Sequence, residues 1–205
     1  MKYANSKTLA SFVVLGGALV ARADVLLDTY AGAAPGFQSN GWSIATTQFI
    51  DRPFSVVGSF NLTSIEVPLG NFNSSTGIYN VSINSDNAGV PGTSLESFNV
   101  NVTTGVGVVQ SYLLNSGLNP MLTTGTYYVV VTTTDGTLSG GWGWNNASNN
   151  GAQQFSTDSG ATWTNFTNVD VAVRVIGSPS TVPEPASLAV LGVGSLVLIR
   201  RRAKK

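Results

Sequence analysis

Alternation of apolar and polar residues is the feature that most constrains the fold of this chain. Successive side chains of a strand point to opposite faces, so an alternating run predicts a strand with one buried and one solvated face. Such runs cover residues 64–69, 79–84, 98–103 and 169–175. Residues 127–131 are continuously apolar, which predicts a central strand covered on both faces. Weaker strand predictions fall at 25–30, 42–49, 54–62 and 106–114.

Residues that favour turns separate these runs. They are Asp86-Asn87-Ala88-Gly89, Pro91-Gly92, Asn115-Ser116-Gly117, Asp135-Gly136 and Gly140-Gly141. Many short strands with regular turns, and no helical period between residues 24 and 176, predict an all-β domain. We therefore expect one antiparallel β-sandwich of jelly-roll type over residues 24–176, followed by a small polar linker over 177–182.

The N-terminus has the pattern of a secretory signal peptide over residues 1–23. Lys2 and Lys7 precede an apolar stretch at 9–20, and Ala21-Arg22-Ala23 forms an A-x-A cleavage site. We expect Sec export, cleavage by signal peptidase and a mature chain that begins at Asp24. The alternative, an uncleaved membrane helix, is disfavoured because the apolar stretch is too short to cross a bilayer.

The C-terminus carries a second membrane signal over residues 183–205. An apolar run at 186–199 would span only about 21 Å as a helix, against a hydrocarbon core of about 30 Å. The basic cluster behind it favours retention on the cytoplasmic side. The other residues of this signal are Val182, Pro183, Glu184 and Pro185 before the run, and Arg200, Arg201, Arg202, Lys204 and Lys205 after it.

The order of Pro-Glu-Pro triplet, apolar helix and basic cluster resembles the PEP-CTERM sorting signal of Gram-negative bacteria. This resemblance implies recognition by exosortase in the inner membrane and removal of the tail by a transpeptidase-like reaction. It also implies release or attachment of the domain at the cell surface or in the extracellular matrix. The alternative is an ordinary weak tail anchor.

Two absent residue types exclude most catalytic chemistry. The sequence contains neither cysteine nor histidine, so disulfides, thiolate sites, Ser-His-Asp catalysis and His-based zinc sites are excluded. Residues 24–182 hold nine acidic and two basic side chains, a net charge of −7. Such a surface repels nucleic acid. We expect no nucleic-acid partner, no metal, no cofactor and no enzymatic activity.

The domain between the two signals resembles the choice-of-anchor ectodomains that occur with PEP-CTERM tails, and among them the R type. The matching stretches are Gly41-Trp42-Ser43, Phe60-Asn61-Leu62-Thr63-Ser64-Ile65 and Pro91-Gly92-Thr93-Ser94-Leu95-Glu96. This resemblance implies a surface domain and supplies no catalytic residues.

One stretch matches the Asp-box pattern Ser-x-Asp-x-Gly-x-Thr-Trp. Its fixed positions are Ser156, Asp158, Gly160, Thr162 and Trp163. The Asp can accept hydrogen bonds from turn amides, the Gly can take φ > 0 and the Trp can pack beneath the hairpin. A single box does not indicate a propeller, so we expect a structural hairpin, with a binding edge as the alternative.

Two indoles at neighbouring odd positions form the candidate sugar site. Trp142 and Trp144 would share one face of an extended segment, beside Asn145, and Trp42 could join them. Flat aromatic rings stack on the C–H faces of sugars, and amides bond their hydroxyls. The alternative is that at least one indole packs in the core.

The acidic residues give weaker functional signals. Glu66 and Glu96 are the glutamates available for a carboxylate pair of glycosidase type, and neither lies in a recognisable motif. Asp51-Arg52 predicts a surface ion pair, and residues 85–89 predict a turn, with a cation site as the alternative.

Three functional hypotheses follow. The first is an exported, exosortase-sorted protein whose β-sandwich has a structural or adhesive, non-catalytic role at the cell surface or in the exopolysaccharide matrix. The second is a carbohydrate-binding module with exopolysaccharide as the partner. The third, a glycoside hydrolase, is disfavoured by the missing histidine and the few glutamates.

Overall fold

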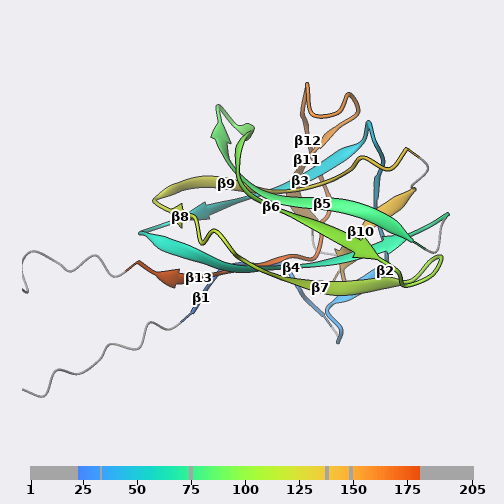
Figure 1. Ribbon diagram of the computed structural model, residues 1–205, viewed down its shortest axis with the longest axis horizontal. Coiled ribbons are helices and arrows are strands. Elements are labelled where there is room, and N and C mark those ends of the chain that lie inside the picture. The colour runs from blue at the N-terminus through green and yellow to red at the C-terminus, as the bar shows by residue number, and fades with distance from the viewer. Residues whose placement is uncertain (1–22, 33, 74–75, 137–138, 148–149, 181–205) are drawn as a thin grey trace, which may run out of the picture.

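The computed structural model describes residues 23–32, 34–73, 76–136, 139–147 and 150–180. These residues form thirteen strands in two antiparallel sheets that pack as a sandwich (Figure 1). The first sheet contains β1 (Asp24–Asp28), β13 (Arg174–Pro179), β4 (Phe60–Asn71), β10 (Gly140–Asn145), β2 (Phe37–Ile44), β7 (Val109–Asn115) and β8 (Met121–Leu122). The second contains β12 (Thr164–Val169), β11 (Asn150–Ser156), β3 (Phe49–Val56), β9 (Gly125–Thr133), β5 (Gly77–Asn87) and β6 (Val90–Val102). The all-β sandwich prediction is confirmed.

The long strand β4 organises the first sheet. One of its edges pairs with β7 and β8, and the other pairs with β13 and then β10. Its alternating residues Ile65, Val67 and Leu69 are fully buried in the core between the sheets. The pattern that predicted a strand at 64–69 therefore also sets which face of β4 the core covers.

The central strand β9 is covered on both faces, as its continuous apolar run predicted. It pairs with β3 and β5, and residues 127–131 are all buried. On its outer face, the Tyr128 hydroxyl donates to Asp86 Oδ1 over 2.8 Å. Asp86 lies near the tip of the β5–β6 hairpin, whose two turn residues Ala88 and Gly89 have φ of 55° and 91°. The hairpin tip thus folds back over the outer face of the second sheet.

The prediction of one continuous strand over 169–175 is wrong. β12 ends at Val169, Val171 forms an isolated bridge with Trp144, and β13 begins at Arg174. Here the chain crosses from the second sheet to the first, and Val171, Ala172 and Val173 are all fully buried. Thr29 supports the crossing by donating from Oγ1 to Val171 O over 2.6 Å and accepting from the Val173 amide over 2.8 Å.

Two predicted turns are strand residues instead. Pro91-Gly92 belongs to β6, and Gly140-Gly141 belongs to the interior strand β10. A Cβ on Gly140 would lie 1.5 Å from the Tyr79 hydroxyl, and one on Gly141 would lie 2.4 Å from the Phe72 ring. These two glycines therefore make room for the side chain of Tyr79, from the opposite sheet, and for that of Phe72, which follows β4.

The predicted linker over 177–182 is also partly wrong. β13 continues to Pro179, and Gly177, Ser178 and Pro179 pair with β4 residues. Residues 1–22 of the predicted signal peptide and residues 181–205, which include the predicted tail helix, lie outside the described residues. Within the described part of the chain, no helix is long and apolar enough to cross a membrane.

Candidate functional site

The candidate site lies where the edges of the two sheets meet. β2 is an edge strand of the first sheet and β12 is an edge strand of the second. The Trp42 indole Nε1 on β2 donates to the Val169 carbonyl on β12 over 2.9 Å. This hydrogen bond ties the two edges together and fixes the ring of Trp42.

Four aromatic rings form a continuous row at this junction. Trp42 contacts Trp144 and Phe166 edge to face, with ring centroids 5.4 Å and 5.0 Å away. Phe166 in turn contacts Phe155 at 5.4 Å. Edge-to-face pairs add about 0.5–1.5 kcal/mol each beyond the area that they bury. The row therefore stabilises the junction whether or not it binds a ligand.

A pocket of about 270 Å³ opens beside three of these rings. It is lined by Trp42, Gln48, Ile50, Phe155, Phe166 and Asn168. Ring faces and two amides, with no charged residue among them, can contact the apolar face and the hydroxyls of a neutral sugar. The volume is just under the range of about 300–1,000 Å³ that is usual for ligand pockets, so a single sugar ring is the appropriate scale.

Trp142 and Asn145 do not reach this pocket, so their prediction as sugar-binding residues is wrong. Trp142 is 0% exposed and donates from Nε1 to the Ala172 carbonyl over 2.8 Å. It stands directly across from Trp42, but β10 lies between β4 and β2 and is therefore an interior strand. Asn145 is 2% exposed. Of the paired indoles Trp142 and Trp42, the one on the edge strand lines the pocket.

Trp144 has a supporting position. Its ring is half-buried against Trp42, and its buried Nε1 has no hydrogen-bond partner among the described residues. Phe155 and Phe166 were not predicted from the sequence as site residues. Their signal was present, because they are the large apolar residues of the two strands that flank the Asp box.

The Asp-box residues form a closed turn between β11 and β12. Asp158 accepts from the Thr162 amide over 2.8 Å, from Thr162 Oγ1 over 2.6 Å and from Ser156 Oγ over 2.8 Å. These hydrogen bonds, led by that of the Thr162 side chain, lower the pKa of Asp158 to about 2. Gly160 has φ of 89°, and a Cβ there would contact Phe49 and Trp163. The turn holds the hairpin that carries Phe155 and Phe166.

The two glutamates are separated and engaged in structural contacts. Glu66 accepts from Arg174 over 2.9 Å and from Ser111 over 2.8 Å. Glu96 accepts from the Gly117 amide over 2.7 Å and the Leu118 amide over 3.0 Å, and also from Ser116. Burial acts to raise the pKa of Glu96, but these hydrogen bonds outweigh it and hold the pKa below its usual value. A general acid needs the opposite shift.

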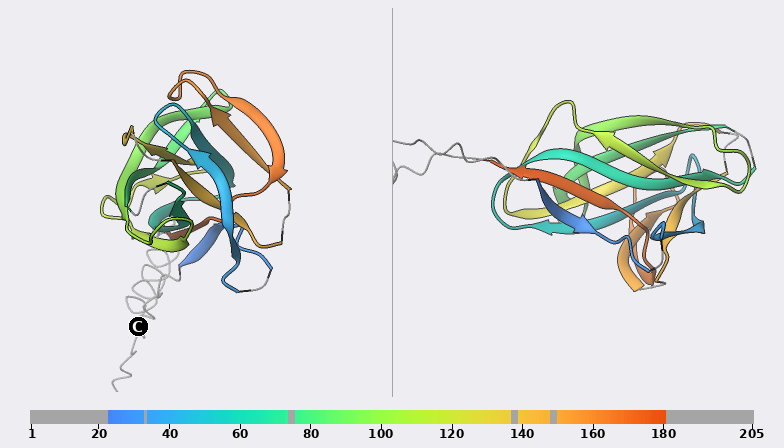
Figure 2. Two further views of the ribbon diagram at one scale, coloured as in Figure 1. Left: turned by 90° about the vertical axis from the view of Figure 1, so that its right-hand side faces the viewer. Right: turned by 90° about the horizontal axis from the view of Figure 1, so that it is seen from below.

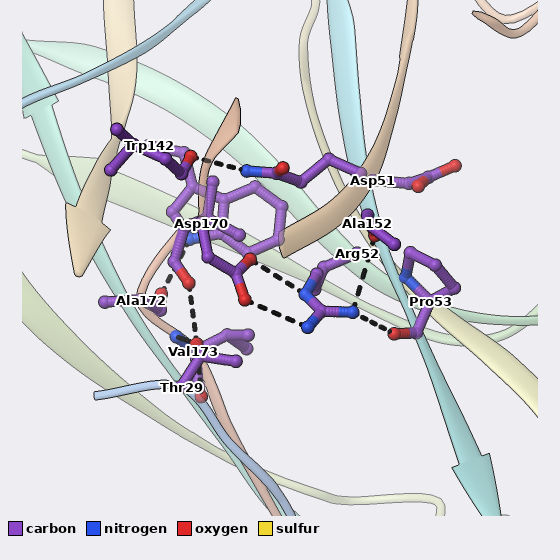
Figure 3. A network of polar contacts seen from close by, with 12 residues as sticks. Thr29, Asp51, Arg52, Pro53, Trp142, Ala152, Asp170, Ala172 and Val173 are labelled. Atoms are coloured by element: carbon purple, nitrogen blue, oxygen red, sulfur yellow. Dashed lines mark hydrogen bonds and ion pairs between the residues drawn. The ribbon is translucent and has the colours of Figure 1, made fainter. Parts of the chain in front are cut away.

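Asp51 and Arg52 do not form the predicted surface ion pair. As neighbours on β3 their side chains point to opposite faces, which Figure 3 shows directly. Arg52 instead forms a bidentate ion pair with Asp170, in which Nε donates to Oδ1 over 2.8 Å and Nη2 donates to Oδ2 over 2.9 Å (Figure 3). This pair joins β3 to the crossing between β12 and β13.

Asp51 is a buried carboxyl without a charged partner on its own face. It is 0% exposed, its Oδ1 accepts from the Gln154 amide over 3.1 Å, and its Oδ2 has no hydrogen-bond partner among the described residues. Burial raises the pKa of Asp51 to about 8, despite the opposing effects of the Gln154 hydrogen bond and of Arg52. Within the described residues, no group of three or more acidic side chains could hold a metal ion.

The fold and site thus define a two-sheet antiparallel β-sandwich with an aromatic pocket at one sheet junction. Comparison with known families found the PEP-CTERM protein-sorting motif at residues 181–203. The chain therefore carries a PEP-CTERM sorting motif at its C-terminus, which implies export and sorting by exosortase. No match was found among curated proteins.

Proposed function

We propose that this chain is an exported protein displayed at the cell surface or in the exopolysaccharide matrix, with a structural or adhesive β-sandwich that has no catalytic role. The sorting motif at 181–203 is the observation that carries the proposal. It agrees with the resemblance of the sandwich to choice-of-anchor ectodomains. The route would pass through Sec, signal peptidase, an inner-membrane intermediate and exosortase.

The chemistry of the domain supports a non-catalytic role. The sequence has no histidine or cysteine, and both glutamates of the sandwich are held by hydrogen bonds in separate parts of the fold. The one acidic side chain with a strongly raised pKa, Asp51, is fully buried rather than placed in a cleft. Among the described residues, the partly exposed carboxylates of Asp28 and Glu66 lie together, but both are paired with Arg174, which favours a structural role.

Comparison of the protein isolated from host cells with and without exosortase tests this proposal. With the enzyme, the protein should lack its C-terminal apolar run and leave the inner membrane. Without the enzyme, it should keep the run and stay in the inner-membrane fraction. Equal tail lengths in both strains would overturn the proposal.

The aromatic pocket favours carbohydrate binding as a second candidate function. Trp42, Phe155 and Phe166 offer ring surface, and Gln48 and Asn168 offer amide donors and acceptors at the rim. Because no charged residue lines the pocket and the domain carries a net charge of −7, a neutral glycan fits better than an acidic one.

Affinity electrophoresis in gels that contain neutral polysaccharides tests this candidate. Retardation should fall severalfold in Gln48→Ala and Asn168→Ala, which remove rim hydrogen bonds without touching the aromatic row. Asn101→Ala, which deletes an exposed amide on β6, is the matched control and should migrate as the parent does. If no polysaccharide retards the parent domain, the pocket has only a packing role.

A further inference from the structure

The chain leaves the sandwich directly from strand β13, with its last described residues still bonded to the domain. Pro179 pairs with Phe60, and the next residue, Ser180, donates its amide to the Ser59 carbonyl over 2.9 Å. The Ser180 hydroxyl also lies 4.0 Å from the sulfur of Met121 on β8. The exit of the chain is thus bonded to the β3–β4 turn and to β8, at the end of the molecule where β1 and β13 lie side by side (Figures 1 and 2).

Apolar side chains surround this exit. Val57 is 83% exposed, and Val25 and Met121 are each 58% exposed. Val25 and Val57 line the same shallow depression of about 380 Å³, which also includes Phe60 and in which Asp24 is the one charged residue. We call Val25, Val57 and Met121 the exit patch.

The distance from the exit patch to the apolar tail is short. The apolar run begins at Ala186, six residues after Ser180. Six fully extended residues reach at most about 20 Å, and two of the residues between are prolines, whose fixed φ restricts the chain. Before the tail is removed, Ser180 must therefore stay within about 20 Å of the start of the apolar run, and Met121 of the patch lies beside Ser180.

We propose that the exit patch rests on the outer surface of the inner membrane while the protein waits for exosortase. This inference depends on the proposed sorting route. Three aliphatic side chains at the lipid interface bind only weakly on their own. The short tether holds the patch at a high local concentration beside the bilayer, and cleavage ends the contact.

Site-specific fluorescence tests this contact. The sequence contains no cysteine, so Val57→Cys places a single environment-sensitive label in the patch. The tail-bearing protein, purified from cells without exosortase, is reconstituted into phosphatidylethanolamine–phosphatidylglycerol vesicles that carry a lipid-attached quencher. Val106→Cys is the matched control, because Val106 is 59% exposed and lies beside Asn71, at the opposite end of β4 from Phe60.

Quenching of the Val57→Cys label should exceed that of the Val106→Cys label by roughly threefold or more, since the ends of β4 are about 36 Å apart. Insertion of about twelve Gly/Ser residues after Thr181 should reduce the difference. Equal quenching at both positions, or a difference that the insertion leaves unchanged, overturns the proposal. Carbonate extraction distinguishes failure of the membrane contact from failure of the sorting route. Protein that stays in the vesicles but shows equal quenching contradicts only the contact. Protein that is washed off the vesicles contradicts the sorting route as well.

Discussion

At the scale of single residues, the neighbours Asp51 and Arg52 have opposite surroundings. Arg52 shares two hydrogen bonds with Asp170 in a largely buried pair. Asp51 lies on the other face of β3, beneath Gln154, whose Nε2 donates to the Gly89 carbonyl and to Asn165 Oδ1 over 2.7 Å and 2.8 Å. These two bonds orient Gln154 so that its Oε1, like Asp51 Oδ2, has no donor. A proton on Asp51 would be a hydrogen-bond donor on this buried face.

The pH dependence of folding tests this account of Asp51. Its folded pKa of about 8 is above the ordinary 3.8, so the folded state binds the proton more tightly. The contribution to the free energy of unfolding is full below pH 4 and is lost as the pH rises toward 8. Asp51→Asn keeps a donor and removes the charge. We expect the variant to be more stable than the parent at pH 8, with the difference shrinking toward pH 4, in denaturant titrations at each pH.

Asp170→Asn is the contrasting variant. It leaves Arg52 in a mostly buried position without its anionic partner, which typically costs about 3–5 kcal/mol. Its loss of stability should appear across the whole range from pH 5 to 8. If Asp51→Asn instead lowers stability at pH 8, the carboxylate of Asp51 is ionised and stabilised in the fold.

At the scale of elements, β10 shows how one strand depends on its neighbours. The Tyr79 hydroxyl occupies the space above Gly140 and bonds to the Gly70 carbonyl and to Asn71 Oδ1. Gly141 and Gly143 are also closely approached by Phe72, Pro68 and Val109. The glycines of β10 therefore allow it to lie between β4 and β2, and this position places Trp142 in the core.

Gly140→Ala should destabilise the sandwich by about 3 kcal/mol or more, because the new methyl group overlaps a hydrogen-bonded hydroxyl. Urea titration measures the loss. Tyr79→Phe removes that hydroxyl, so the double variant should lose less than the sum of the two single changes. Gly136→Ala, where a Cβ would meet nothing within 4 Å, should be close to neutral. Additive single changes would contradict the close contact between Gly140 and Tyr79.

The strands that the sequence predicts well are those whose neighbours lie in one sheet. Runs such as 79–84 keep one face on the core throughout β5, so alternation marks them. The run at 169–175 has the same pattern, but it crosses between sheets and all three central residues are buried. The glycines of β10 suggested a turn, because nothing local indicates which side chains fill the space above them.

The candidate pocket was only partly predictable for a similar reason. Trp42 was predicted only as a third indole that could join Trp142 and Trp144, whereas Phe155 and Phe166 join it through the meeting of two sheet edges. Trp142 and Trp144 belong to one sequence motif but have different surroundings. Trp142 packs in the interior, whereas Trp144 packs against Trp42 on an edge strand. Edge and interior positions depend on strand order, which alternation does not encode.

At the scale of the whole molecule, the sandwich is joined to its sorting signal by a rigid exit. β13 ends at Pro179, Ser180 is bonded to the domain, and the sorting motif begins at residue 181. On the proposed sorting route, this short connection would hold the domain close to the membrane until processing separates the two.

Intact-mass spectrometry of the protein isolated from its own cells tests the central claim most directly. The account predicts a chain that begins at Asp24, after loss of residues 1–23, and that no longer contains residues 186–205. Any added mass on the new C-terminus would identify its attachment. A protein that retains residues 186–205 in cells with active exosortase would contradict the account.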